Sequence, residues 1–402
     1  MTKRVIILGA SVAGLGAALE LRRCGFEGQI VLLDAQPHLP YDRPPLSKAI
    51  LTGDATAESI RFHAESDYES AQIELRLATA VTSIYPASRS VSLATGEVLA
   101  ADYIIIATGA RARPFPASAS CEGICTIRDL EDGLRLNEAL KRSNTLAVIG
   151  GGFIGAEVAS SARKLGVEVT IFEVDDLPFK RILGPVVAAR WASLHHEAGV
   201  ALKTGVRVQQ VRRDSGTGFV LTLSDGTSHA ADIVVAGLGA VPNTEFLDGS
   251  GLAIGDGVMC DSVGRTSHVG IYAAGDVANW EPVHGSLRAR DEHWTSAREH
   301  ARIVAHDICG QTGAPWSEYI PYFWSDMHGK RLQVLGTPQF ADAVRIVFED
   351  QAKGAFLAEY GCDGILVGVA GCNAAVRLNK YRAKLPSRPP FDETDTGTGV
   401  SI

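Results

Sequence analysis

Residues 146–155 read LAVIGGGFIG and residues 5–14 read VIILGASVAG, so one pattern occurs twice in the chain. Each stretch is a short apolar run typical of a buried strand, followed by glycines at the spacing that opens a helix. Helical spacing and a second apolar strand follow in both cases. The order strand, helix, strand predicts a parallel sheet in each region. We therefore predict an α/β protein with two Rossmann-like nucleotide-binding domains.

The first glycine loop predicts a dinucleotide site. Gly9 permits the tight turn from strand to helix, and Gly14 lets the helix pack against the sheet. Backbone N–H groups at the helix start then face a pyrophosphate. Ser11 stands where a glycine is usual, which is a small departure from the motif. Asp34 ends the second strand, where its carboxylate can accept hydrogen bonds from ribose hydroxyls. The alternative is a strand-turn-helix without a ligand.

The second loop, residues 150–155, carries the full glycine pattern, and Glu173 closes the strand that follows it. An acid at that position favours a free 2′-hydroxyl and repels a 2′-phosphate, which predicts NADH in preference to NADPH. Lys180 and Arg181 lie just beyond and could hold a phosphate, so we expect NADPH as a weaker substrate. Two dinucleotide sites in one chain indicate a tightly held redox cofactor and an exchangeable one, with hydride transfer between them.

Composition excludes several other classes of protein. The chain has 402 residues, 46% of them hydrophobic, which is enough for two or three domains with their own cores. Its 38 Lys and Arg against 46 Asp and Glu give a net charge of −8, which disfavours nucleic acid as the main ligand. Seven scattered cysteines predict reduced thiols in the cytoplasm. No signal peptide, membrane span or metal-ligand spacing is evident, so we expect no membrane and no metal.

The chain is similar to the FAD-dependent, NADH-using ferredoxin reductases that serve Rieske dioxygenases and bacterial cytochromes P450, which have a glutathione-reductase-like fold. The matching motifs are 39–48 (LPYDRPPLSK), 107–109 (ATG), 150–157 (GGGFIGAE), 239–243 (GAVPN), 272–276 (YAAGD), 292–294 (EHW) and 321–326 (PYFWSD). The resemblance covers nearly the whole chain. It implies an FAD domain in two segments, 1–110 and 236–315, an NAD domain at 111–235, and a C-terminal α+β interface domain at 316–402. We expect a flexible tail at the end of the last domain.

The resemblance and the two loops together assign residues to each cofactor. The residues expected at FAD are Gly9, Ala13, Gly14, Asp34, Arg43, Lys48, Val81, Ala107, Thr108, Gly109, Arg128, Gly275, Asp276 and Trp294. The residues expected at NAD are Gly150, Gly152, Phe153, Ile154, Gly155, Glu157, Glu173, Arg181, Gly239, Glu292 and Trp324.

Three of these side chains are expected to act in catalysis. The resemblance implies that Lys48 lies beside the flavin and pairs with Glu157. An ammonium there would stabilise the negative charge of reduced flavin, and the carboxylate would keep it in position. The alternative is a solvated lysine and an ordinary acid in the first turn of a helix. Trp324 is expected near the nicotinamide, where a planar ring could shield the flavin face from water; a core tryptophan is its alternative.

The electron acceptor is the least direct inference. Residues 41–51 contain no cysteine, so electrons cannot leave through an active-site disulfide there. Single electrons would pass to a [2Fe-2S] ferredoxin, which is acidic in such systems and calls for a basic docking surface. The candidate cations are Arg288, Arg290, Arg298, Arg302, Arg377, Lys380, Arg382 and Lys384, for which solvated helix faces are the alternative. Rival functions are an NADH oxidase, a reductase of rubredoxin or small oxidants, and a redox-controlled binding module.

Overall fold

The computed structural model describes residues 3–214, 216, 218–282, 288–313, 316–391 and 400–401. The chain forms two compact units, each made of three segments. The first contains Met1–Asp42, Ile60–Arg111 and Val241–Tyr319, and the second contains Arg43–Ser59, Ala112–Ala240 and Ile320–Ile402. These units group residues by contact, and the three domains predicted from the sequence group them by cofactor, so the predicted domain boundaries stay a prediction. The predicted tail lies mostly outside the described residues.

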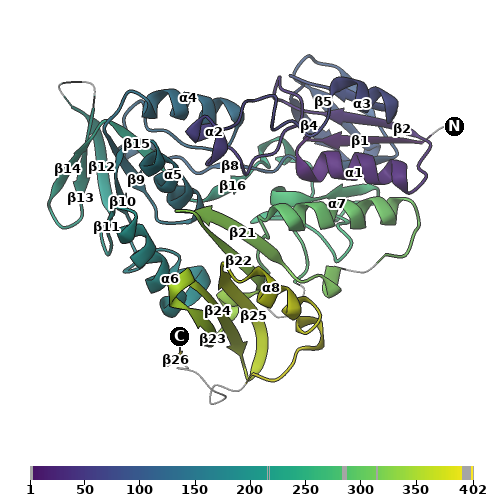
Figure 1. The fold of residues 1–402 in the computed structure, drawn as a ribbon. Coiled ribbons are helices and arrows are strands. Elements are labelled where there is room, and N and C mark those ends of the chain that lie inside the picture. The colour runs from purple at the N-terminus through teal and green to yellow at the C-terminus, as the bar shows by residue number, and fades with distance from the viewer. Residues whose placement is uncertain are drawn as a thin grey trace. The chain divides into compact units, whose positions relative to one another are not determined.

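The first unit is built on a parallel sheet in the order β19-β7-β1-β2-β3. Its strands are β1 (Arg4–Leu8), β2 (Gln29–Leu33), β3 (Ile73–Arg76), β7 (Tyr103–Ile106) and β19 (Ile271–Ala273). Residues Val5 to Leu8 are at most 1% exposed, because both faces of the sheet are covered. Helices α1 (Val12–Arg23) and α7 (Trp294–Ile308) pack against each other beside the sheet (Figure 1), while α3 (Glu65–Ser70) contacts β3. The expected strand-helix-strand order is therefore present.

Two small sheets complete the first unit. The sheet β4-β5-β6 is antiparallel and is made of β4 (Val81–Tyr85), β5 (Ser90–Leu93) and β6 (Val98–Ala100). The sheet β17-β18-β20 is mixed: β18 (Gly257–Met259) pairs antiparallel with β17 (Ile254–Gly255) and parallel with β20 (Ala278–Asn279).

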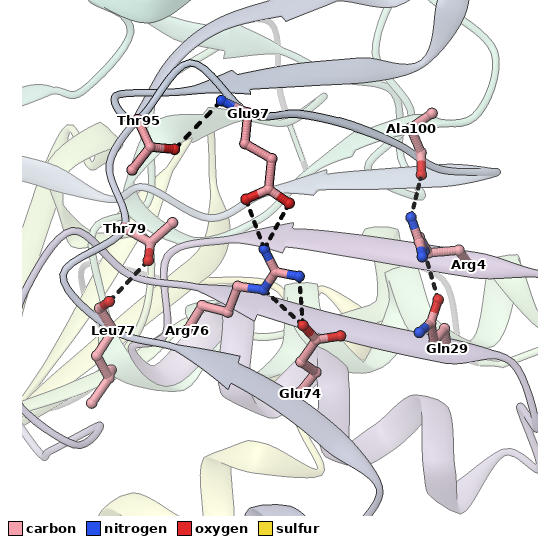
Figure 2. Close-up of polar contacts among 9 residues, drawn as sticks. All are labelled: Arg4, Gln29, Glu74, Arg76, Leu77, Thr79, Thr95, Glu97 and Ala100. Atoms are coloured by element: carbon pink, nitrogen blue, oxygen red, sulfur yellow. Dashed lines mark hydrogen bonds and ion pairs between the residues drawn. The ribbon is translucent and has the colours of Figure 1, made fainter.

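Polar side chains connect the layers of the first unit at their solvent edge (Figure 2). Arg76, the last residue of β3, is held between Glu74 at 2.6 Å and Glu97 at 3.1 Å. Arg4 donates to the Gln29 side chain at 2.7 Å, across the β1–β2 register, and to the backbone oxygen of Ala100 at 3.3 Å. These exposed contacts fix the sheet edge, whereas most of the stability comes from the apolar core.

The second unit repeats the parallel arrangement in the order β11-β10-β9-β15. Its strands are β9 (Thr145–Ile149), β10 (Glu168–Phe172), β11 (Val200–Lys203) and β15 (Ile233–Ala236), and an antiparallel sheet adds β12 (Val208–Arg213), β13 (Phe219–Leu223) and β14 (Ser228–Ala231). Its helices are α2 (Ala49–Thr52), α4 (Leu130–Leu140), α5 (Phe153–Lys164) and α6 (Lys180–Glu197). Helix α6 is kinked at Gly184, which precedes Pro185. Strands β8 (Ala110–Ala112) and β16 (Ala240–Pro242) lie where the chain passes between the units.

The C-terminal part of the second unit is a six-stranded sheet in the order β21-β22-β25-β24-β23-β26. Its elements are β21 (Tyr322–Met327), β22 (Lys330–Gly336), β23 (Ala343–Asp350), β24 (Ala355–Cys362), β25 (Ile365–Cys372), β26 (Val400–Ser401) and helix α8 (Ala375–Asn379). The predicted fold class, two Rossmann-like regions and an α+β C-terminal part, is confirmed. No helix among the described residues is long and apolar enough to cross a membrane.

Candidate functional site: two dinucleotide loops and a buried ion pair

The first loop has the backbone that a dinucleotide cradle requires. Gly9 has φ +100°, and a Cβ on it would lie 2.3 Å from the Ala107 oxygen; a Cβ on Gly14 would lie 1.8 Å from the Gly9 oxygen. Only glycine fits at either position. Asp34 accepts from the Ala10 amide at 2.8 Å and from the Gln36 amide at 2.8 Å. The loop and the acid are therefore held together at the carboxyl edge of the sheet, where such sites occur.

Two further motifs of the first unit are fixed next to this sheet. Thr108 donates to the Asn243 oxygen at 2.9 Å, and the Asn243 amide donates back to the Thr108 oxygen at 2.9 Å. A Cβ on Gly275 would lie 2.8 Å from the Ala13 Cβ, so α1 and the turn containing Asp276 approach closely. The sequence analysis missed Asn243, although it ends the motif at 239–243.

His300 contacts the turn that contains Gly275 and Asp276. It is 1% exposed, stacks on Trp280 with ring centroids 3.9 Å apart, and accepts from the Gly275 amide at 3.2 Å. Burial lowers the pKa of His300 from 6.5 to about 3. The ring is therefore neutral at physiological pH and remains an acceptor for Gly275.

The remaining predicted FAD residues divide between the units. Trp294 donates to Asp42 at 2.8 Å and carries the Arg298 guanidinium over its ring at 5.1 Å, while Val81 begins β4. Arg43, Lys48 and Arg128 belong to the second unit, where Arg43 donates to the Arg128 oxygen at 2.7 Å. Their role at FAD stays a prediction.

The second loop repeats the first in detail. Gly150 has φ +101°, and a Cβ there would lie 2.4 Å from the Gly237 oxygen; a Cβ on Gly155 would lie 2.2 Å from the Gly150 oxygen. Glu173 accepts from the Gly151 amide at 2.7 Å and from the Asp175 amide at 3.0 Å. Around a Cβ on Gly152, the N-cap of α5, no atom lies within 4 Å, which leaves room for a phosphate at the helix start.

An open cavity of about 790 Å³ lies beyond Glu173, at the carboxyl end of β10. Its lining consists of Val174, Asp175, Asp176, Lys180, Arg181, Pro185 and Gly205. The two cations predicted to hold a phosphate are paired with acids, Arg181 with Asp175 at 2.7 Å and Lys180 with Asp176 at 2.8 Å. Each of these cations thus has an acidic partner, and the preference for NADH over NADPH stays a prediction.

Glu157, in the second turn of α5, is a buried acid. Its side chain is only 6% exposed, and it forms an ion pair with Lys48 at 2.7 Å. Ser47 donates to the same carboxylate at 2.5 Å, and Ser325 of β21 donates to its other oxygen. Lys48 also donates to the Pro44 oxygen at 3.1 Å. A carboxylate buried this deeply needs such partners, and the structure confirms the Lys48–Glu157 contact that the resemblance implied.

The two serines that hold Glu157 were not predicted, although each adjoins a predicted residue in sequence. Ser325 points to the buried face of β21, and Trp324 points to the other face, where it stacks with Tyr322 at 6.1 Å. Trp324 is thus separate from the Lys48–Glu157 contact.

The other predicted NAD residues are scattered. Phe153 packs on Phe179, Ile154 is 44% exposed at the start of α5, and the Gly239 oxygen accepts from the Arg113 amide. Glu292 belongs to the first unit, where it pairs with Arg290 at 2.6 Å.

The two groups of candidate docking cations differ in their partners, except that Arg298 of the first unit is exposed and lies over the Trp294 ring. In the first unit Arg290 is paired with Asp256 and Glu292 and only 8% exposed, Arg302 is paired with Glu299, and Arg288 donates to the Cys260 oxygen at 2.9 Å. In the second unit Arg377, Lys380, Arg382 and Lys384 are all exposed. None of these four forms an ion pair with a carboxylate in the described part of the chain. The second group, defined here as the α8 basic patch, therefore keeps its positive charge available.

Comparison with known proteins places the chain in a family. Residues 3–301 match the pyridine nucleotide-disulphide oxidoreductases, and residues 322–397 match the reductase C-terminal domain. The chain belongs to the pyridine nucleotide-disulphide oxidoreductase family. All seven of its cysteines are free, which agrees with the absence of a redox motif at 41–51.

Individual relatives narrow the class to electron-transfer reductases. The chain is 35% identical to the 3-phenylpropionate/cinnamic acid dioxygenase ferredoxin–NAD(+) reductase component of Photorhabdus laumondii, covering 96% of both chains. It is 35% identical to a rubredoxin–NAD(+) reductase of Pseudomonas putida, covering 86% of this chain and 90% of that protein. Its structure resembles putidaredoxin reductase in a covalent complex with putidaredoxin, with a TM-score of 0.90, 33% identity and coverage of 96% and 94%.

Proposed function

We propose that this oxidoreductase passes electrons from NADH through a tightly bound FAD to a [2Fe-2S] ferredoxin that supplies a Rieske oxygenase or a cytochrome P450. The observation that carries the proposal is the presence of two glycine cradles, each with an acid bonded to its loop, in a family of ferredoxin and rubredoxin reductases. FAD would supply the conversion of a two-electron hydride into single electrons. Free cysteines support a reducing, cytoplasmic location.

The chain's own residues would orient and stabilise the cofactors. The Gly9 loop with Asp34 would hold FAD, and the Gly150 loop with Glu173 would hold NADH. The Lys48 ammonium, kept in place by Glu157, would stabilise negative charge on the reduced flavin. Trp324, on the half-buried face of β21, would exclude water from the nicotinamide side.

The α8 basic patch supports an acidic protein as the acceptor. Arg377 lies over the Phe348 ring at 3.9 Å and Arg382 over the Tyr322 ring at 4.5 Å, so aromatic faces position both guanidinium groups. Val376, 79% exposed beside them, adds an apolar contact of the kind found within docking surfaces.

Stopped-flow spectroscopy tests the proposal. We expect rapid bleaching of the flavin by NADH and strong acceleration of cytochrome c reduction when a [2Fe-2S] ferredoxin is added. Rapid bleaching without that acceleration would favour an NADH oxidase or a reductase of small oxidants, and acceleration by rubredoxin alone would favour the rubredoxin alternative. Slow bleaching would favour a redox-controlled binding module.

A further inference from the structure

Helices α1 and α7 of the first unit lie side by side (Figure 1), and both are capped by a cysteine, Cys24 and Cys309 respectively. One turn earlier on each helix is another side chain that can bind a metal, Glu20 on α1 and His306 on α7. Residues three or four apart share a helix face. Four potential ligands therefore meet at one end of the helix pair, although their separation in sequence matches no metal motif.

The geometry of this cluster is compact. One ligand atom from each of Glu20, Cys24 and His306 lies within 4.8 Å of the others, and His306 Nε2 is 3.1 Å from Glu20 Oε1. The Cys24 and Cys309 thiols are within hydrogen-bonding reach of each other. His306 Nδ1 is buried and has no hydrogen-bond partner among the described residues. His306 therefore faces Glu20 with Nε2, while its second ring nitrogen has no protein partner in the described part of the chain.

The local field favours a cation. Both helices direct their C-terminal ends, which carry partial negative charge, toward the cluster. Two thiolates and a carboxylate would leave a divalent ion with one excess negative charge, and two guanidinium groups are placed to offset it. Arg23 contacts Glu20 at 2.6 Å, and Arg302 interacts electrostatically with Glu20 and Cys24.

We propose that Glu20, Cys24, His306 and Cys309 form a binding site for Zn²⁺ or a similar thiophilic divalent cation. Thiolate and imidazole ligands select zinc over Mg²⁺ and Ca²⁺, which prefer oxygen. The metal joins the C-terminal ends of α1 and α7, and binding displaces a proton from each thiol. The Gly9 loop lies at the opposite end of α1, about 18 Å away along a 12-residue helix, so the site stabilises the first unit and takes no part in hydride transfer.

The test is a titration of the flavin-loaded, full-length protein with Co²⁺ and Cd²⁺, after chelation and reduction without a competing thiol. We expect one equivalent to bind with thiolate charge-transfer absorption, tetrahedral Co²⁺ bands, and a higher melting temperature in Zn²⁺. Cys24→Ser and His306→Gln should each weaken binding about 100-fold. NADH reduction of the flavin should not change.

Cys362→Ser is the matched control, because Cys362 also has an acid beside it, Asp363, but lies outside the cluster. It should leave the titration unchanged. If Cys24→Ser fails to fold, His306→Gln and Glu20→Gln provide the same comparison. The absence of a saturable site, or a titration that neither Cys24→Ser nor His306→Gln alters, would overturn the proposal.

Discussion

The two glycine loops have the same backbone conformation and the same contact with an acid, but the helices that follow them differ in sequence, and the difference between Gly16 and Glu157 is the most informative. Both first glycines have φ near +100°, and both loops donate an amide to the acid that ends the next strand. Seven residues after the first glycine, α1 has Gly16. A Cβ added there would lie 3.2 Å from the Cβ of Ala301 in α7. At the same position α5 has Glu157, buried against Lys48.

The same strand-to-helix turn is therefore followed by two different kinds of helix. Helix α1 packs closely against α7, with Gly16 next to Ala301 at the contact. Helix α5 places a buried charge beside its loop, which suits a site where charge changes during the reaction. The two loops share a backbone that suits a dinucleotide, and Glu157 at the position of Gly16 gives α5 a buried charge that α1 lacks there.

The largest effects are expected from replacing the first glycine of each loop by alanine. The two variants should lose different cofactors. Gly9→Ala should yield protein without flavin, because its Cβ would lie 2.3 Å from the Ala107 oxygen. Gly150→Ala should keep the flavin and lose NADH binding. Flavin absorbance per protein and NADH titration measure both. Gly96→Ala is the control, since it has a similar φ of +88° but no atom within 4 Å of its Cβ. Equal flavin content in all three would contradict the assignment.

The next largest effect is expected from changing either partner of the Lys48–Glu157 ion pair. Lys48→Met should slow flavin reduction by NADH by about 10² to 10³-fold, as for loss of one stabilising donor. Glu157→Gln should have a smaller effect, because the amide can still accept from Ser47. Lys164→Met breaks an exposed ion pair with Asp54 in the same unit and should have almost no effect. Rates for Lys48→Met that match this control would remove Lys48 from the site.

Among the described residues, His300 of the first unit and His195 of the second are buried and neutral, which predicts a similar pH response in both units. Burial lowers the pKa of His300 to about 3, and burial with the nearby His328 and His196 lowers that of His195 to about 3. The proton therefore binds the unfolded chain more tightly, so stability is complete above pH 6.5 and is lost as the pH falls toward 3. Between pH 6.5 and pH 5, each of these histidines should lower the free energy of unfolding by about 2 kcal/mol.

Denaturant unfolding at pH 7 and pH 5 measures this loss. His300→Gln and His195→Gln should each lose less stability between these pH values than the parent protein. His196→Gln should behave nearly like the parent, because His196 is exposed and is the weakest of the three causes that lower the pKa of His195. An identical pH dependence in all variants would show that the buried rings are not responsible.

The acid of the second loop should set the choice of nucleotide. Glu173→Ala should narrow the preference for NADH over NADPH by about 1 to 2 kcal/mol, through lost ribose hydrogen bonds and lost repulsion. The ratio of kcat/KM for the two nucleotides measures it, with Glu168→Ala at the exposed start of β10 as control. An unchanged ratio would exclude Glu173 from the site.

The smallest effect is expected from the α8 basic patch, which contrasts with the paired Arg290 and Arg302 of the first unit. Reversing Lys380 and Arg382 to glutamate should raise the ferredoxin KM several-fold at low salt, and added salt should reduce the difference. Lys141→Glu with Arg142→Glu, just after the C-terminal end of α4, is the control, because both of these cations are paired with Glu138. Equal KM values would move the docking surface elsewhere.

Local patterns made much of the fold and part of the site predictable. The strands before Gly9 and Gly150 and the acids Asp34 and Glu173 follow from hydrophobic runs and glycine spacing, because each cradle is built from a continuous segment of about 30 residues. The Lys48–Glu157 contact required a family resemblance, since no spacing rule relates residues so far apart. Ser47 and Ser325 had no signal of their own beyond adjoining predicted residues.

By itself, the sequence determined the two nucleotide-binding folds and the acid that follows each glycine loop, Asp34 and Glu173. It also determined the absence of a disulfide motif at 41–51. All of these depend on residues close together in the chain. Only the tertiary structure decided which cations remain available, since ion pairs such as Arg290 with Asp256 depend on packing. It also brought Glu20, Cys24, His306 and Cys309 together. A cluster made by two helix ends is set by how the helices pack, which no local pattern encodes.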